Sequence, residues 1–193
     1  MNAVGVRLPI ARHAIFFSTA MPAIYRWCSM NNIIIRPMAV EDAASFHACV
    51  DAVAREAKFL SMLQAPPLEQ TLAFVKENIA NGYTQFIAHD GKRVVGWCDI
   101  LPAPHAAVRH CGTLVIGLLP EHRGKGLGRQ LITACIAKAP DIGVTRIELD
   151  ARADNGPAIH LYERTGFVRE GLKKNGLRMS GQYFDAITMA LLL

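Results

Sequence analysis

The chain has 193 residues, of which 51% are hydrophobic and 19% are charged, and its formal net charge is +5. This length fits one domain with a substantial core, and this composition excludes a wholly disordered chain. No stretch reaches the about 18 apolar residues of a membrane span. The mild charge requires no nucleic acid, so we expect a soluble, cytoplasmic protein with neither a membrane nor a nucleic-acid partner.

The first 30 residues carry three arginines and no acid, and the first carboxylate of the chain is Glu41. A targeting segment is one interpretation, but Pro22 interrupts its apolar part and no small-residue cleavage site follows. The alternative is an upstream start, because Met30 directly precedes a predicted strand at residues 33–36. We therefore expect residues 1–30 to be a dispensable or loosely docked extension and residues 31–193 to be a single domain.

Apolar side chains at helical spacing predict two helices, one at residues 40–58 and one from residue 68 up to Gly82, separated by Pro66 and Pro67. The apolar residues 59–63 fit packing in the core or under a lid better than the alternative, a pocket lining. The side chains expected to face the core are Phe46, Val50, Val53 and Ala57, then Leu68, Leu72, Val75 and Ile79.

A hairpin is predicted at residues 83–100, because alternating or apolar runs flank the turn sequence Asp90-Gly91-Lys92. A polar connector leads to a strand at residues 111–119, which feeds a glycine-rich turn. The helix predicted at residues 127–138 has one apolar face and ends before Pro140. Alternating apolar residues then predict a strand at residues 144–151.

The last helix is opened by Gly156 and Pro157, with Asn155 or Asp154 near its cap, and Gly166 closes it. A final hairpin is predicted at residues 167–192, turning at Ser180-Gly181. Strands alternate with helices in the middle of the chain and pair as hairpins at both ends. The fold class is therefore α/β, with a mixed sheet and helices on both faces.

The glycine-rich turn has the composition of an anion site. Gly124, Gly126 and Gly128 lack Cβ atoms, so the backbone can adopt positive φ and bring its N–H groups close to a ligand. The helix that follows directs its positive dipole end at the same place. The basic side chains of Lys125 and Arg129 add to the local charge. The expected ligand of this turn is therefore a phosphate or pyrophosphate group.

Spacing separates the phosphate-binding motifs that compete for this turn. A Walker loop needs Ser or Thr after Gly-Lys, but Gly126 follows Lys125. A dinucleotide fingerprint needs G-x-G-x-x-G directly after the strand and an acid about 20 residues on. Glu148 and Asp150 meet the second condition loosely, but the glycines here have a different spacing and residues 120–123 separate them from the strand. The pattern that remains is Arg123-x-x-Gly126-x-Gly128. It resembles the acyl-CoA pyrophosphate loop, Arg/Gln-x-x-Gly-x-Gly/Ala, of the GNAT superfamily of N-acetyltransferases.

A second motif follows at the expected distance. Asn155, Ala158, Tyr162, Gly166 and Phe167 match the family's signature Asn-x-x-Ala-x-x-x-Tyr-x-x-x-Gly-Phe. Two loose motifs in the right order are much harder to obtain by chance than one. The resemblance covers roughly residues 31–193.

The resemblance implies a fold and a co-substrate. It implies a mostly antiparallel central sheet that splays between strands 4 and 5, here residues 111–119 and 144–151, and a slot that takes the pantetheine arm of acetyl-CoA. The residues that it assigns to acetyl-CoA binding are Leu118, Leu119, Arg123, Gly124, Lys125, Gly126, Leu127, Gly128, Arg129, Asn155, Ala158 and Tyr162.

Acetyl transfer to an amine needs a neutral nucleophile, a polarised carbonyl and a protonated leaving thiolate. By resemblance, Tyr162 is the general acid, although a tyrosine packed against the core with its hydroxyl at the rim is the alternative. Asn155 binds pantetheine, caps its helix, or does both. Backbone amides from Gly117 to Leu119 are expected to polarise the carbonyl.

The general base stays open. Glu148 and Asp150 on the fifth strand and His110 before the fourth are candidates, and water alone is the alternative. The segment from Gly181 through Asp185 resembles the terminal strand of the branches that act on amino acids, phosphinothricin-like compounds and ribosomal-protein termini. Asp185 there either attracts an amine or forms a salt bridge.

The five cysteines, Cys28, Cys49, Cys98, Cys111 and Cys135, are odd in number and scattered, which favours free thiols in a reducing compartment. Without a Cys-x-x-Cys pair or a His-Glu-x-x-His motif, we expect no metal site. The first functional hypothesis is an N-acetyltransferase for a small, amino-acid-like primary amine. The alternatives are a protein N-terminal or lysine acetyltransferase and a non-catalytic acyl-CoA-binding module. A homodimer is one expected assembly.

Overall fold

The computed structural model describes residues 33–193, so the extension predicted at residues 1–30 and Cys28 lie outside the described residues. Seven strands form one sheet in the order β1-β2-β3-β4-β5-β7-β6, in which β4 and β5 are parallel and all other neighbours are antiparallel. The strands are β1 (Ile34–Pro37), β2 (Thr84–His89), β3 (Val94–Pro102), β4 (Cys111–Leu118), β5 (Arg146–Arg152), β6 (Val168–Met179) and β7 (Gln182–Leu192).

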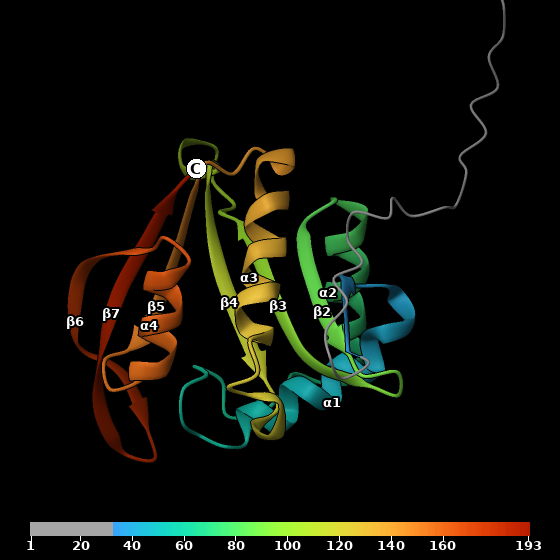
Figure 1. Cartoon of the computed structure of the whole chain (residues 1–193), viewed down its shortest axis with the longest axis horizontal. Helices are drawn as coiled ribbons and strands as arrows, with labels where there is room; N and C mark the ends of the chain where they lie inside the picture. The colour runs from blue at the N-terminus through green and yellow to red at the C-terminus, as the bar shows by residue number, and fades with distance from the viewer. Residues whose placement is uncertain (1–32) are drawn as a thin grey trace, which may run out of the picture.

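The helices cover both faces of this sheet (Figure 1). On one face, Trp97 of β3 packs edge-on against Phe46 of α1, with ring centroids 5.8 Å apart. On the other face, the Cys135 Sγ of α3 donates to the Cys98 carbonyl at 3.2 Å. The predicted mixed α/β fold is confirmed. The helices are α1 (Ala43–Ala54), α2 (Leu68–Ala80), α3 (Leu127–Lys138) and α4 (Gly156–Arg164).

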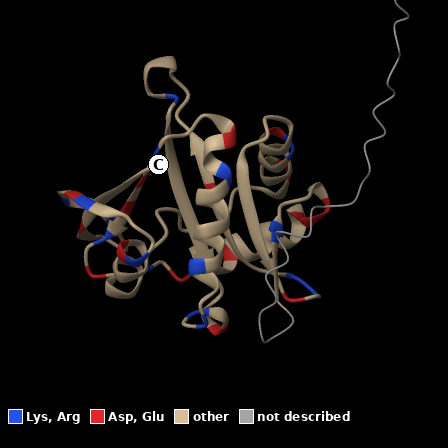
Figure 2. Ribbon diagram, turned by 45° about the horizontal axis from the view of Figure 1, so that its top comes forward, with Lys and Arg blue, Asp and Glu red and all other residues tan. Residues whose placement is uncertain are grey.

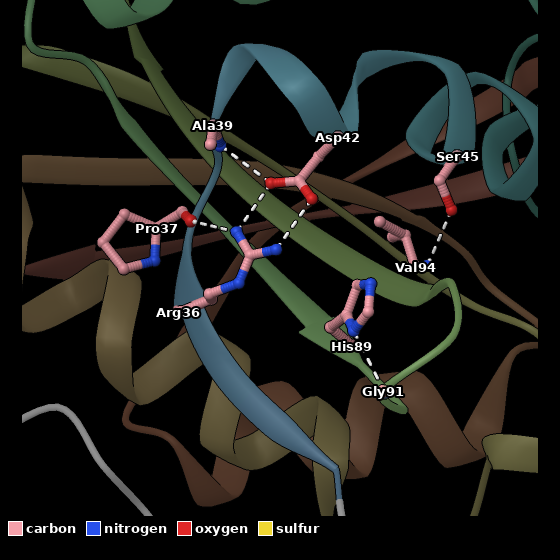
Figure 3. Close-up of polar contacts among 8 residues, drawn as sticks. All are labelled: Arg36, Pro37, Ala39, Asp42, Ser45, His89, Gly91 and Val94. Atoms are coloured by element: carbon pink, nitrogen blue, oxygen red, sulfur yellow. Dashed lines mark hydrogen bonds and ion pairs between the residues drawn. The ribbon is translucent and has the colours of Figure 1, made fainter.

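Polar contacts fix the start of α1 over the sheet (Figure 3). The guanidinium of Arg36 donates to both carboxylate oxygens of Asp42, at 2.6 and 2.7 Å, and the Ala39 amide donates to one of them at 2.9 Å. Burial raises the pKa of Asp42, but these hydrogen bonds outweigh it and hold the pKa below its usual value. Ser45 of α1 accepts from the Val94 amide of β3 at 2.8 Å. The helix is thereby tied to two strands.

The first two helices differ from their predictions. Residues 40–42 form a 3-10 turn, α1 ends at Ala54, and the connector to α2 spans residues 55–67. On α2 the buried side chains are Thr71, Val75 and Asn78, whereas Leu68 and Ile79 are 46% and 41% exposed. The predicted apolar stripe of α2 is therefore wrong except at Val75 and the half-buried Leu72. The helix is rotated so that two polar side chains point inward, which hydrophobic spacing alone does not indicate.

The apolar segment of the connector is also placed differently from the prediction. Phe59, Met62 and Leu63 are 43%, 37% and 53% exposed. Packing of this segment in the core is therefore wrong for these three residues. Leu60 of the same segment does pack against the core, so the segment lies along the surface with one side chain turned inward.

The parallel strands β4 and β5 are paired only at their first residues. Cys111, Gly112 and Thr113 lie opposite Arg146, Ile147 and Glu148, and no later pair forms. Yet β4 stays paired with β3 as far as Leu118, and β5 stays paired with β7 as far as Arg152. The sheet therefore opens into a gap between β4 and β5 while each side of the gap remains fully paired. The predicted splay is confirmed.

Two glycines allow close packing beside this gap. A Cβ on Gly117 would lie 2.2 Å from the Trp97 ring, so the indole can pack directly over β4. A Cβ on Gly128 would lie 2.9 Å from Leu161 of α4, so the start of α3 can approach α4. That Cβ would also lie 3.5 Å from the Leu118 side chain, so the N-terminal end of α3 lies next to the end of β4 (Figure 1).

Among the described residues, no helix is long and apolar enough to cross a membrane. The same part of the chain contains no group of three or more His, Cys, Asp or Glu side chains that could hold a metal ion. Its four cysteines are free thiols, and three of them are buried: Cys49, Cys98 and Cys135.

Candidate active site

The edge of β4 that faces the gap carries backbone groups without a strand partner. The Leu119 amide donates to the Val95 carbonyl of β3, and its carbonyl accepts from His122. Leu119 is therefore not free, contrary to the expectation, because it pairs with β3 and starts a 3-10 turn. Since successive amides of a strand point to opposite sides, the amides of Ile116 and Leu118 are the ones that point into the gap.

The glycine-rich turn opens directly beyond this edge. Gly124 and Gly126 have φ angles of 71° and 79°, a left-handed conformation that favours glycine. Gly126 is the N-cap of α3, and the first backbone bond into the helix runs from the Gln130 amide to the Gly126 carbonyl. Within the described residues, no hydrogen bond engages the amides of residues 124–129. Six N–H groups are thus available to an anion at the positive end of α3.

The Arg123 side chain is exposed, but its guanidinium is bonded to groups of the protein itself. Its amide donates to the Pro120 carbonyl at 3.2 Å, and its Nε donates to the Leu118 carbonyl at 2.9 Å. Its two terminal nitrogens donate to the carboxylate of Glu56 in the connector. The expected series of loop amides therefore begins at Gly124, not at Arg123.

The other basic side chains of the turn are exposed. Lys125 and Arg129 are both exposed and form no ion pair with any described residue. Figure 2 shows basic residues both in this turn and at the start of α3. They can attract a phosphate group, while Leu127 and Gly128 provide backbone amides, because the Leu127 side chain is buried.

Tyr162 lies on α4, on the sheet face that α3 and α4 share. It is 9% exposed and packs edge-on against Phe167, with ring centroids 6.0 Å apart. Burial, with a smaller contribution from Cys98 on β3, raises the pKa of its hydroxyl above the usual value. The hydroxyl therefore stays protonated at neutral pH. No described residue accepts or donates a hydrogen bond at this oxygen, so it is free to bond a ligand.

Asn155 caps the helix that carries Tyr162. Its side-chain oxygen accepts from the Ala158 amide at 3.3 Å, which satisfies one of the free N–H groups of the first turn of α4. The capping role predicted for Asn155 is thus present. Its side-chain amide nitrogen has no partner among the described residues, which leaves the second role, pantetheine binding, as a prediction.

The three candidate bases occupy different positions. Glu148 is half-buried at the closed end of the gap, where Arg146 donates to it at 2.5 Å. Asp150 is exposed and accepts from Thr188 and Lys173 at 2.8 and 2.7 Å. His110 is exposed and precedes β4, on the far side of the three paired residues from the gap. Glu148 lies at the closed end of the gap, where an arginine already holds it, and Asp150 lies further along β5, where its carboxylate is bonded to residues of β6 and β7.

One buried acidic residue, Asp99, was not predicted from the sequence as part of the site. Asp99 lies on β3 opposite Val115 of β4 and is 4% exposed. Burial raises its pKa to about 7, against a smaller opposing effect of the neighbouring Gln85 amide. The signal was available, because Asp99 is the one charged residue in the apolar run from Val94 to Leu101.

The connector crosses from one side of the gap to the other. Its Glu56 binds Arg123 at the end of β4, as described above. Further along, the Lys58 carbonyl accepts from Arg152 at the end of β5, at 2.7 Å. The Arg152 guanidinium also lies over the rings of Phe59 and Phe184, at 4.7 and 4.1 Å from their centroids. These contacts tie the connector to both strands that border the gap.

Asp185, which the sequence analysis gave two possible roles, belongs to the β6–β7 hairpin. It accepts from Lys174 at 2.8 Å and from the Asn175 amide at 2.9 Å. These hydrogen bonds, that of Lys174 first, lower its pKa. Asp185 therefore forms the salt bridge that was one of its two predicted roles, while the neighbouring Tyr183 is 59% exposed.

Comparison with known proteins assigns the family. Residues 51–167, more than half of the chain, match the acetyltransferase (GNAT) family. The chain belongs to the GNAT family. The resemblance drawn from the two motifs is therefore confirmed.

Individual acetyltransferases show similarity to this chain of different extents. N-alpha-acetyltransferase RimI of Mycobacterium tuberculosis is 33% identical over 118 residues, which cover 61% of this chain and 71% of RimI. A GNAT acetyltransferase of Streptococcus pneumoniae has 27% identity and a TM-score of 0.78, covering 83% of this chain and 99% of that protein. The yncA protein of Salmonella typhimurium, solved with its cofactor acetyl-CoA, has 21% identity and a TM-score of 0.79, covering 84% and 95%.

Other relatives match over a shorter segment. Mycothiol acetyltransferase of Pseudarthrobacter chlorophenolicus is 40% identical over 83 residues, which are 41% of this chain. The chain spans only 25% of the length of that enzyme. A match over a quarter of that enzyme identifies no acceptor for this chain.

Proposed function

We propose that this GNAT protein is an acetyl-CoA-dependent N-acetyltransferase that transfers the acetyl group directly to a primary amine in a ternary complex. The observation that carries the proposal is the gap between β4 and β5, which opens directly onto six unpaired amides at the start of α3. This arrangement fits a ligand with a pyrophosphate at one end and a narrow arm, which is the shape of acetyl-CoA. The family and the yncA structure support the same co-substrate.

The residues divide the work of binding and catalysis. The amides of residues 124–129 hold the pyrophosphate, and the exposed Lys125 and Arg129 add attraction. The free edge of β4 at Ile116 and Leu118 aligns the arm, so that remote binding energy positions the thioester. Where the thioester carbonyl meets one of these amides, the N–H stabilises the negative charge that develops on its oxygen.

Tyr162 supplies the proton that the leaving thiolate needs. Its side chain is 9% exposed, and its hydroxyl is protonated and without a partner among the described residues, on the face shared by α3 and α4. General acids of this kind contribute about 10²–10⁴-fold to rate. Asn155 keeps the helix that carries Tyr162 capped and offers its amide nitrogen to the pantetheine arm.

We favour a small, amino-acid-like acceptor over a protein. The connector contacts Arg123 on one side of the gap and Arg152 on the other, so it closes the gap at this point. A flexible protein terminus or lysine side chain needs a more open groove. Acetylation of protein N-termini, as the name of RimI states for that relative, is the alternative. A cytoplasmic location and a homodimer stay predictions.

Two measurements on the full chain test the proposal. Calorimetric titration with CoA is expected to show saturable binding, and a panel of amino acids, polyamines and short peptides is expected to reveal an acceptor that releases CoA from acetyl-CoA. Binding without turnover of any amine would leave the non-catalytic acyl-CoA-binding module. Absence of CoA binding would refute both. Turnover of peptides but not of free amines would select the protein acetyltransferase.

A further inference from the structure

Asp99 and Gln85 form a buried polar pair on the sheet face that α1 covers. They are direct partners across β2 and β3, and each is 4% exposed. Oδ1 of Asp99 and both polar atoms of the Gln85 amide are buried without a hydrogen-bond partner in the described part of the chain. Native proteins rarely leave such groups unpaired, because burying them without a partner is unfavourable. The pair is therefore a candidate for binding a ligand.

The position of Asp99 relates it to the closed end of the gap. Asp99 lies opposite Val115 of β4, two residues beyond the last pair of β4 with β5, Thr113 with Glu148. Neighbouring strands are about 4.8 Å apart, so the carboxyl is one strand away from the gap. Val115 is half-buried and Thr113 is exposed, so the surface reaches the neighbour of Asp99. The gap runs along β4 from the glycine turn down to this level.

No charged side chain controls the proton on Asp99. Its neighbours across the sheet are Gln85 and Val115, and the buried side chains of α1 and α2 are uncharged. Of the acids on β5, Glu148 is held by Arg146, and Asp150 is held by Lys173 and Thr188. Burial alone moves the pKa of Asp99 up to about 7, and only the Gln85 amide opposes it. A carboxyl of this pKa changes its protonation state near neutral pH, as a general base requires.

We propose that Asp99 is the proton acceptor for the amine substrate, and this proposal rests on the N-acetyltransferase function proposed above. The ammonium form of the amine gives one proton to the Asp99 carboxylate, which becomes a carboxylic acid. The neutral nitrogen attacks the thioester carbon and forms the C–N bond. The C–S bond then breaks, and the thiolate takes the proton of the Tyr162 hydroxyl.

The remaining protons balance with solvent. The nitrogen loses its second proton as the amide forms, Tyr162 regains one, and Asp99 releases the one it accepted. Each turnover therefore yields the acetylated amine, CoA and one proton. Acid and base lie on opposite faces of the sheet, with Tyr162 beside α3 and Asp99 beside α1, so they act on opposite sides of the reacting carbon.

The test compares the wild-type chain with Asp99→Asn, which keeps the shape of the side chain but cannot accept the proton. The matched control is Asp141→Asn, an exposed acid paired only with Lys138. For each protein, CoA affinity is measured by calorimetry. CoA release is followed from pH 5.5 to about 9 with the best amine of the panel. Carbon-detected NMR of the wild-type carboxyls measures the Asp99 pKa independently of activity.

The expected result is a fall in kcat of about 10²-fold or more for Asp99→Asn. CoA affinity should stay within a factor of about two, and the wild-type rate should rise with pH through an apparent pKa near 7 that the variant lacks. Asp141→Asn should match the wild type. If Asp99→Asn turns over at the wild-type rate, or if its rate still rises with pH through a pKa near 7, Asp99 is not the proton acceptor. These results would leave the N-acetyltransferase function itself in place. A wild-type chain without turnover overturns the N-acetyltransferase function and Asp99 with it. An NMR pKa near 4 also overturns the assignment.

Discussion

Replacing Gly126 by alanine tests the pyrophosphate loop most directly. Gly126 has φ +79°, and a Cβ built on it meets nothing within 4 Å, so the substitution strains the backbone without a clash. The left-handed conformation costs an alanine about 1–2 kcal/mol. The lower entropy of the unfolded chain offsets about 0.4–1 kcal/mol of this. The net loss of about 1 kcal/mol should lower Tm by about 2–4 °C for a domain of this size.

The effect on CoA binding should be larger than this strain explains. The added methyl group occupies the space in which a phosphate approaches the amides of residues 124–129. Losing one hydrogen bond to a charged group is worth about 1.5–3 kcal/mol, so the affinity should fall about tenfold or more. Thermal unfolding measures the strain, and calorimetric titration with CoA measures the affinity.

Gly143 provides a matched control for this experiment. It has φ +77°, and a Cβ on it also meets nothing within 4 Å, but it follows α3 at the opposite end of the helix. Gly143→Ala should therefore lose the same stability and keep its CoA affinity. Equal affinities for the two variants would refute the reasoning, because the loss in Gly126→Ala would then reflect backbone strain alone or would not exist.

Three further predictions follow from the same structure. Tyr162→Phe should lower kcat by about 10²-fold or more without weakening CoA binding, and unchanged turnover measured by CoA release would remove it as the general acid. Gly117→Ala should destabilise the fold by about 1–3 kcal/mol in urea unfolding, because its Cβ would overlap the buried Trp97 ring; an unchanged midpoint would contradict that packing. Because burial raises the Asp99 pKa from 3.8 in the unfolded chain to about 7, its contribution to stability is present at low pH. The contribution is lost as the pH rises to about 7, by on the order of 4 kcal/mol. Urea unfolding of Asp99→Asn should lack this loss, and equal pH dependence of the two proteins would refute the shift.

The sequence predicted the parts of the fold that local chemistry determines. The hairpin at Asp90 and Gly91, the helix behind Gly126 and the cap at Asn155 are all present, because turn residues and caps act within a few positions of the chain. The splay of β4 from β5 has no local signature of this kind. It came from the resemblance, and the register of the two strands then confirmed it.

The errors arose where tertiary contacts decide. The rotation of α2, which buries Thr71 and Asn78, depends on what the helix packs against, and hydrophobic spacing does not contain that information. The partner of Arg123 is Glu56, 67 positions earlier, so no spacing rule links them. Asp99 was visible as an acid in an apolar strand, but only the strand order shows that it lies one strand away from the gap.

The short ladder between β4 and β5 has a consequence for the mechanics of the molecule. Beyond three residue pairs, these two strands share no backbone hydrogen bonds. The part of the sheet with β1–β4 and the part with β5–β7 can therefore move relative to each other about this short ladder. A ligand whose arm carries amide groups can form hydrogen bonds with the free strand edges in the gap, and it would then hold the two parts of the sheet together. Saturating CoA should then slow deuterium uptake at Ile116 and Leu118 and raise Tm through linkage. Bound co-substrate would thus contribute to the stability of the fold, and its release would remove that contribution.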